Sequence, residues 1–189
     1  MLEKIPPFVG RGLAHVRSGI DHVVALRAGI ANTPASIVVT SPAFAAGGVL
    51  PARFTADGPG ISPPIAWSGI PEAARSVAIV IEGVDSPSPM PVVHGIVVRL
   101  PPRDGELPEG ELRELGATVV VGRNSFFGAT WLPPDPPPGH GFHRYVFEVF
   151  ALDGDPPLGP HPGRASLVDA LAGHTLARGL LVATYRRSS

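Results

Sequence analysis

The sequence predicts a mainly β domain with a helical segment near each end, and three features of the chain support this. Short runs rich in β-branched residues recur along most of the 189 residues. Glycine and proline, with 23 and 24 residues, form turn clusters between these runs. Helical signals are confined to one stretch near each end of the chain, an apolar stripe in the first and a capping-box variant in the second. A chain of this length can bury a core as a single domain.

The predicted strands follow the β-branched runs, and the predicted turns follow the clusters of small and proline residues. Strands are expected at residues 37–39, 76–82, 94–100, 118–121, 145–152 and 180–185. Turns are expected at residues 57–60, 86–89 and 136–139. The chain should therefore form short strands joined by tight, stiff connections.

A helical extension is predicted ahead of the β domain. Apolar residues fall on one stripe of a helix over residues 12–31, and they are Leu13, Val16, Ile20, Val23 and Ile30. Pro34 ends this helix, because the residue before a proline avoids the α conformation. The chain thus divides into an extension at 1–34 and a β domain at 35–189. The extension is expected either to pack on the domain or to form a homodimer contact.

A second helix is predicted near the C-terminus. Ser166 and Asp169 have the spacing of a capping box, with aspartate in place of glutamate or glutamine, and open a helix that runs toward Arg178. Gly179 is expected to end the helix, and the final strand follows it.

Composition and charge exclude several classes of function. The net charge is −1, which gives no electrostatic basis for binding nucleic acid. There are no cysteines, which excludes disulfides, thiolate catalysis and cysteine-based zinc sites. No signal peptide and no long apolar run is visible, so we expect a cytoplasmic protein without integral membrane association.

The first candidate site residues lie where an apolar strand ends. Glu82 and Asp85 follow that strand, and Pro87 begins a proline-rich loop. Such carboxylates can orient a histidine or bind a ligand hydroxyl or amine. The alternative is that either carboxylate only accepts hydrogen bonds from backbone amides of the loop.

A histidine leads the next aliphatic strand. Strict alternation places His94 on the same face as Ile96 and Val98, and opposite Val97 and Arg99. His94 is therefore a candidate pocket residue, although a core histidine with satisfied hydrogen bonds would give the same pattern.

A third candidate segment joins a proline loop to a strand. Pro137 and Gly139 lie in the loop, and His143 and Tyr145 share one face of the strand, with Arg144 on the other. A histidine and a tyrosine beside glycine amides suit phosphate or carboxylate oxygens. The spacing of residues 140 and 143 is weak evidence for zinc, which normally needs at least three protein ligands. No hydrolase elbow, phosphate loop or cofactor motif is present.

The two signature segments resemble those of the phosphatidylethanolamine-binding protein family, in its bacterial and archaeal Raf-kinase-inhibitor-like branch. The resemblance covers roughly residues 37–186, through segments 41–58, 62–67, 82–94 and 136–145. It implies two antiparallel sheets with Greek-key connections and a shallow surface pocket for phosphate-like or carboxylate anions.

Carried over by position, the resemblance implies a set of pocket residues. These are Asp85, Pro87, His94, Pro137, Gly139, His143 and Tyr145. Gly83 stands where the family usually has its first motif aspartate, and the neighbouring Glu82 is the candidate replacement for that carboxylate. A shift of one residue along a strand reverses the side-chain direction, so the two positions are not equivalent. The chain ends shortly after Tyr185, without the flanking helix of animal members, so we expect an open site.

The resulting interpretation is a small-anion binding protein with a regulatory role and an unidentified protein partner. The ligand would be phosphate, a carboxylate or a phosphorylated headgroup. The alternative is a small-molecule enzyme that pairs His94 or His143 with Glu82 or Asp85 as general acid and base.

Overall fold

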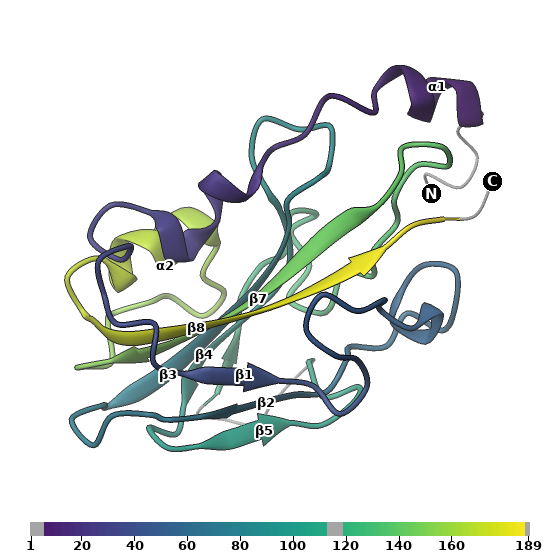
Figure 1. Ribbon diagram of the computed structural model, residues 1–189. Helices are drawn as coiled ribbons and strands as arrows, with labels where there is room; N and C mark the ends of the chain where they lie inside the picture. The colour runs from purple at the N-terminus through teal and green to yellow at the C-terminus, as the bar shows by residue number, and fades with distance from the viewer. Residues whose placement is uncertain (1–5, 113–118, 188–189) are drawn as a thin grey trace.

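The chain folds as a sandwich of two antiparallel sheets, in a computed structural model that describes residues 6–112 and 119–187 (Figure 1). The large sheet has the strand order β6-β4-β3-β7-β8 and the small sheet the order β1-β2-β5. The strands are β1 (Val38–Thr40), β2 (Ile65–Ser68), β3 (Ser76–Gly83), β4 (Val92–Leu100), β5 (Gly105–Leu107), β6 (Val120–Val121), β7 (His143–Leu152) and β8 (Thr175–Tyr185). The prediction of a mainly β fold with two antiparallel sheets is confirmed.

The predicted strands correspond to β1, β3, β4, β6, β7 and β8, while β2 and β5 were not predicted from the sequence. Residue 118, where one predicted strand begins, lies outside the described residues. The missed strands have four and three residues, which is too short for a clear alternating pattern.

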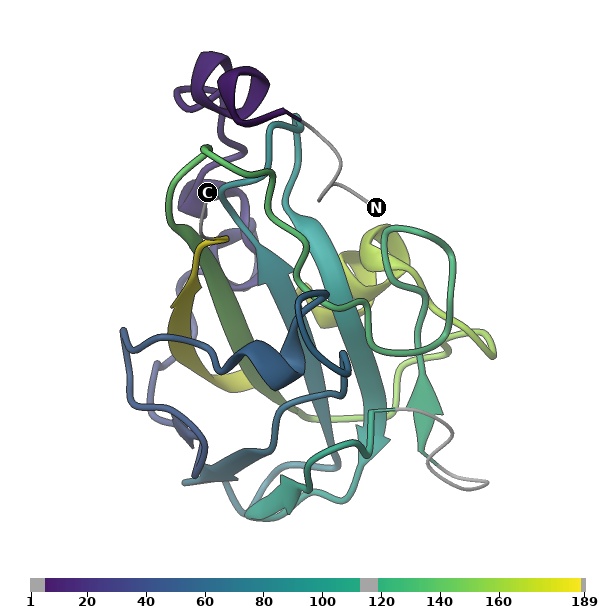
Figure 2. The same cartoon turned by 90° about the vertical axis from the view of Figure 1, so that its right-hand side faces the viewer.

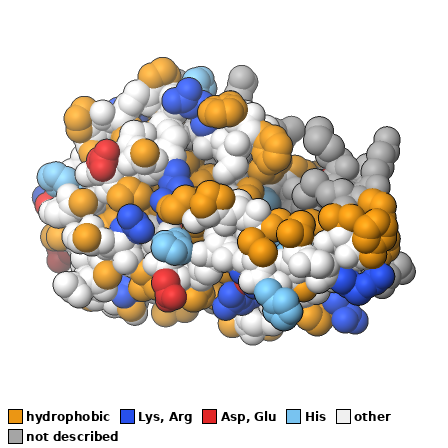
Figure 3. Space-filling view, turned by 90° about the horizontal axis from the view of Figure 1, so that it is seen from above, with side chains coloured by type: hydrophobic (Ala, Val, Ile, Leu, Met, Phe, Trp, Pro, Cys, Tyr) orange, Lys and Arg blue, Asp and Glu red, His pale blue; other side chains and the backbone are white. Residues whose placement is uncertain are grey.

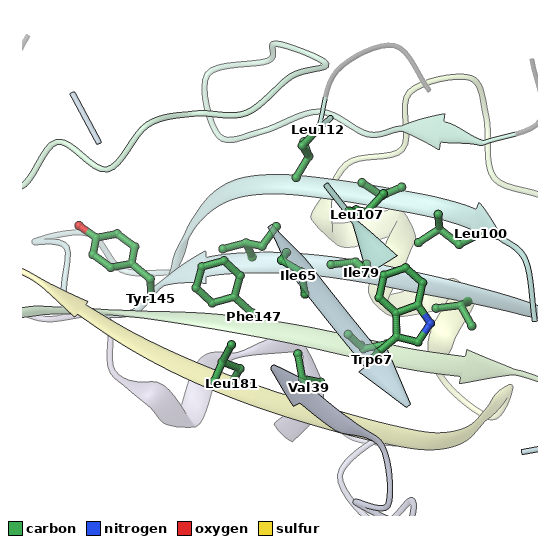
Figure 4. Packing of buried hydrophobic residues seen from close by; sticks show 14 of the residues in the cluster. Val39, Ile65, Trp67, Ile79, Leu100, Leu107, Leu112, Tyr145, Phe147 and Leu181 are labelled. Atoms are coloured by element: carbon green, nitrogen blue, oxygen red, sulfur yellow. The ribbon is translucent and has the colours of Figure 1, made fainter. Parts of the chain in front are cut away.

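The main core lies between the two sheets. Figure 4 shows side chains of the large sheet, such as Ile79 and Phe147, facing Val39 and Trp67 of the small sheet. Phe44 packs against Phe147 with ring centroids 5.4 Å apart. Burial of this apolar surface supplies the main driving force that holds the sheets together.

A second apolar layer covers the opposite face of the large sheet. The N-terminal segment and the helix α2 (Arg164–Leu171) lie across this face (Figures 1 and 2). Val23, Val24 and Ile30 are completely buried there. The central strand β3 is therefore buried on both faces, which explains its nearly continuous apolar sequence.

The prediction of one helix over residues 12–31 is wrong. The short helix α1 (Pro7–Gly12) ends where the predicted helix begins, and the segment itself contains two 3-10 turns, Ile20–His22 and Val24–Leu26. Gly19 has a φ of 84°, a left-handed conformation that interrupts a helix. Packing of this segment on the sheet, the first of the two predicted alternatives, is what the single chain shows.

The C-terminal helix is shorter than predicted. It ends at Leu171, since residues from Thr175 onward pair with β7 in the large sheet. Gly179 lies inside β8, where a Cβ atom would be only 2.2 Å from the Ile37 carbonyl oxygen. The N-cap is Gly163, and the Ser166 hydroxyl donates to its carbonyl, so the predicted capping box does not form.

Candidate functional site

The candidate residues meet where β3 ends and where β4 and β7 begin. Gly83 pairs with Val92 of β4 and with Tyr145 of β7, so these strand ends lie side by side. Figure 4 shows the Tyr145 hydroxyl pointing away from the core cluster, toward this end of the sandwich. We use the term histidine site for His94, His143 and Tyr145.

His94 is held as a neutral imidazole inside the histidine site. Its Nδ1 lies 2.7 Å from the Leu132 carbonyl oxygen, and because a carbonyl only accepts, Nδ1 carries the proton. In the neutral ring Nε2 is then a hydrogen-bond acceptor. The ring contacts Tyr145 edge-on at 5.1 Å and Trp131 at 5.8 Å between centroids. Burial lowers the pKa of His94 to about 4.

A β-bulge sets the direction of the His94 side chain, and the prediction that it shares a face with Ile96 is wrong. The register of β3 and β4 shifts at this point, from Ile81 opposite Gly95 to Glu82 opposite Val93. His94 is the extra residue, so its ring turns toward Tyr145 while Ile96 lies in the layer beneath α2. A bulge interrupts the period of two on which the prediction rested.

His143 pairs with a second histidine. Its Nε2 lies 2.8 Å from Nδ1 of His140, and both rings are almost completely buried. Burial, together with His140 and Arg17 nearby, lowers the pKa of His143 to about 3. The pKa of Tyr145 is raised, mainly by burial, so its hydroxyl keeps its proton at neutral pH. The site thus offers neutral hydrogen-bonding groups at pH 7.

Asp85 serves as an anchor for two arginines. It accepts hydrogen bonds from the backbone N–H of Arg144 at 2.7 Å and from its Nε and Nη2 at 2.8 Å. Arg17 adds an ion pair at 3.1 Å. Burial alone would raise the pKa of Asp85, but the hydrogen bonds from Arg144 and Arg17 lower it to about 2. The anticipated bonding to a backbone amide therefore occurs, in addition to ion pairing.

The structure does not bring Glu82 together with the histidine site. Glu82 is on the opposite face of the large sheet, where it accepts a hydrogen bond from Val24 N–H at 2.8 Å and pairs with Arg164 at 2.6 Å. Glu148 lies beside it and accepts from Ala25 N–H at 2.6 Å. Burial and Glu82 raise the pKa of Glu148 well above its usual value. This carboxyl pair holds the N-terminal segment rather than a ligand.

The missing side chain of Gly83 leaves the space that the His94 ring occupies. A Cβ atom at Gly83 would lie 2.7 Å from the His94 Nε2 and 3.4 Å from a Tyr145 ring carbon. The absence of a side chain here therefore lets the imidazole lie directly against the strand. Neither Glu82 nor Asp85 is hydrogen-bonded to His94 or His143 in the described part of the chain, so the anticipated acid–base pair is not assembled.

The proline loop is covered by the N-terminal segment. Pro137 is buried, whereas Pro87 is exposed on its own loop. Gly139 has a φ of 81°, and a Cβ atom there would lie 2.5 Å from the Pro7 carbonyl oxygen of α1. The expectation of an open site is wrong, because residues 7–17 occupy this side of the molecule. They form the apolar and basic end of the surface seen from above (Figure 3).

Three residues of this region were missed as site components, and they are Arg17, His140 and Trp131. His140 was considered only for its spacing to His143. Arg17 lies far from both motifs in sequence, whereas Trp131 lies just ahead of the segment 136–145. Residues 6–112 and 119–187 contain no group of three or more metal-ligating side chains placed to hold a metal ion. None of the helices in those residues is long and apolar enough to span a bilayer.

Comparison with known proteins shows which family this sequence matches. The family model for phosphatidylethanolamine-binding protein matches residues 40–186. The UPF0098 protein of Methanothermobacter thermautotrophicus is 35% identical over 147 residues, which cover 77% of this chain and 95% of the relative. A UPF0098 protein of Pyrococcus abyssi is 35% identical over 155 residues, covering 80% of this chain and 86% of the relative.

Solved structures agree with the sequence relatives. YbcL of E. coli, described as a member of the mammalian PEBP family, superposes with a TM-score of 0.75 at 28% identity, over 81% of this chain and 99% of YbcL. The putative PEBP homolog CT736 of Chlamydia trachomatis gives 0.73 at 31% identity, over 81% of this chain and 99% of CT736. This chain belongs to the phosphatidylethanolamine-binding protein family.

Proposed function

We propose that the chain binds a small anion at the histidine site: a phosphate, a carboxylate or the phosphate of a headgroup. The observation that carries the proposal is the convergence of His94, His143 and Tyr145 at one end of the large sheet. Membership of a family named for binding a phospholipid headgroup supports the same chemistry.

Hydrogen bonding explains how such a site accepts an anion. The Tyr145 hydroxyl keeps its proton because its pKa is raised, so it remains a donor. An anion that approaches His94 or His143 favours the protonated ring, and the resulting charge-assisted hydrogen bond is stronger than a neutral one. Binding therefore draws a proton into the site, and affinity should increase as the pH falls.

The charges on the Asp85 side of the histidine site also favour an anion. Asp85 carries one negative charge, and Arg144 and Arg17 carry two positive charges against it. Gly83 adds no carboxylate at the position where the family usually has an aspartate. Beside Asp85 the balance is therefore positive, whereas on the Tyr145 side Arg187 is paired with two carboxylates, Asp57 and Asp135.

The test is calorimetric titration with inorganic phosphate, phosphoethanolamine and acetate. We expect at least one of these anions to bind the native chain, and His143→Ala to weaken binding about tenfold or more, by the loss of one charge-assisted hydrogen bond. His174→Ala is the matched control, because His174 is exposed at the far end of β7 and β8, where its side chain pairs with Asp153. Absence of binding, or equal binding by His143→Ala, would refute the proposal.

A regulatory action on a protein partner, a cytoplasmic location and a homodimeric state belong to the same proposal. In this view the occupied site changes the surface that a partner contacts. The buried residues of the N-terminal segment, such as Val23 and Val24, are already covered within one chain. A homodimer would therefore have to use other surfaces.

A further inference from the structure

Residues 7–17, which we call the cap, are fastened across the loop that precedes His143. Arg17 is the main fastening, and its guanidinium donates to the carbonyl oxygens of Phe142 at 2.8 Å, His140 at 3.0 Å and Ala14 at 3.1 Å. Its fourth partner is the Asp85 carboxylate at 3.1 Å. One side chain thus connects the cap to both signature segments of the chain.

Two glycines allow the cap and the loop to touch backbone to backbone. A Cβ atom at Gly10 would lie 2.0 Å from the Pro138 carbonyl oxygen, and one at Gly139 would lie 2.5 Å from the Pro7 carbonyl oxygen. His140 lies beneath this contact, with its ring near the carbonyls of Leu13 and Val16. Its Nε2 is buried without a hydrogen-bond partner among the described residues.

The cap is an addition to the part of the chain shared with relatives. The family match begins at residue 40, after the cap and the segment that follows it. That following segment is anchored by backbone hydrogen bonds from Ser18 to Ser86 and from Gly19 to Val84. The cap is therefore held near the site by the backbone hydrogen bonds of the residues that directly follow it.

We propose that the cap sets the ligand specificity of the histidine site, by restricting it to small free anions. This inference rests on the proposed function. With the cap closed, His140 and His143 are almost completely buried, so an oxyanion without substituents is the ligand that needs the least displacement of the cap. An anion that carries a headgroup or a lipid must keep the cap displaced, and so it loses the three contacts of Arg17 outside the cap, with Phe142, His140 and Asp85. The specificity is the difference in affinity between the unsubstituted oxyanion and the anion that carries a headgroup.

Gly10→Ala tests the proposal with a closely matched control. A methyl group at Gly10 meets the Pro138 oxygen and should displace the cap, whereas a methyl group at Gly12, in the same helix, meets nothing within 4 Å. Calorimetry with inorganic phosphate and with glycerophosphoethanolamine gives the preference for the smaller ligand. We expect Gly10→Ala to reduce this preference about tenfold and Gly12→Ala to leave it unchanged.

Cleavage by trypsin after Arg17 reports on the cap without any ligand. Gly10→Ala should accelerate this cleavage, and Gly12→Ala should not. If inorganic phosphate, phosphoethanolamine and acetate all fail to bind, the proposed function fails, while accelerated cleavage still shows that the cap was displaced. If the cap is displaced and the ligand preference is unchanged, the specificity inference is overturned and the proposed function stands.

Should Gly10→Ala fail to fold, Arg17→Ala replaces it in the binding assay. Arg75→Ala at the far end of β3 is then its control.

Discussion

Gly83→Ala should destabilise the protein through a single contact, the one with His94. The added methyl carbon would lie 2.7 Å from Nε2 and 3.3 Å from Cδ2 of the imidazole. The ring cannot move away freely, because its Nδ1 is hydrogen-bonded to Leu132 and the ring contacts Trp131 and Tyr145. The substitution therefore forces the imidazole out of its present position.

The expected cost follows from overpacking of a filled site. Inserting one methyl group into a well-packed core typically costs about 1–3 kcal/mol, so we expect about 2 kcal/mol for Gly83→Ala. For a chain of this size each kcal/mol lowers the melting temperature by about 2–4 °C, which gives a decrease of about 4–8 °C. Gly154→Ala serves as the control, since a Cβ atom there meets nothing within 4 Å.

A double-mutant cycle isolates the contact. Thermal unfolding is followed by circular dichroism for Gly83→Ala, His94→Ala and the double variant. If the clash is with the imidazole, Gly83→Ala should cost little in the His94→Ala background. An equal cost in both backgrounds, or an unchanged melting temperature for Gly83→Ala alone, would refute this account of Gly83.

Two further predictions concern pH. Burial lowers the pKa values of His94 and His143 to about 4 and 3, below the unfolded value of 6.5. Stability present above about pH 6.5 should thus be lost as the pH falls, by about 3 kcal/mol for His94 alone. Melting temperatures measured with and without sulfate check this, since a bound anion should reduce the loss; a flat pH profile would contradict it. Burial and Glu82 raise the pKa of Glu148, so stability should fall as the pH rises above about 4.5. Glu148→Gln keeps an acceptor for Ala25 N–H and should remove that decrease; a variant much less stable than the native chain at about pH 8 would contradict it.

The sequence was most informative where strands are buried on both faces. β3 and β7 appear as apolar runs because the small sheet covers one face and the N-terminal segment with α2 covers the other. The same covering misled the prediction for residues 12–31. Apolar residues spaced along an extended segment can pack on a sheet without forming a helix, and local spacing does not distinguish the two cases.

The site was harder to predict because its contacts join distant parts of the chain. Arg17 contacts residues more than 120 positions away, and no local pattern signals such a pair. Glu82 and Asp85 are three residues apart, yet they bind different partners. Glu82 contacts Val24 and Arg164, and Asp85 contacts Arg144 and Arg17. The residue types in the two signature segments indicated where a site would lie. The side-chain directions depended on strand register, which the sequence does not specify.

Because of the bulge at His94, the number of residues in β4 is as important to this site as the identity of the histidine. Deleting Val93 would restore regular alternation with His94 opposite Glu82, and would move the imidazole to the face covered by α2, among apolar side chains. A relative could therefore keep a histidine in an aligned column and still lack it in the site. For this part of the chain, the position of an alignment gap carries functional information that the column of residues does not.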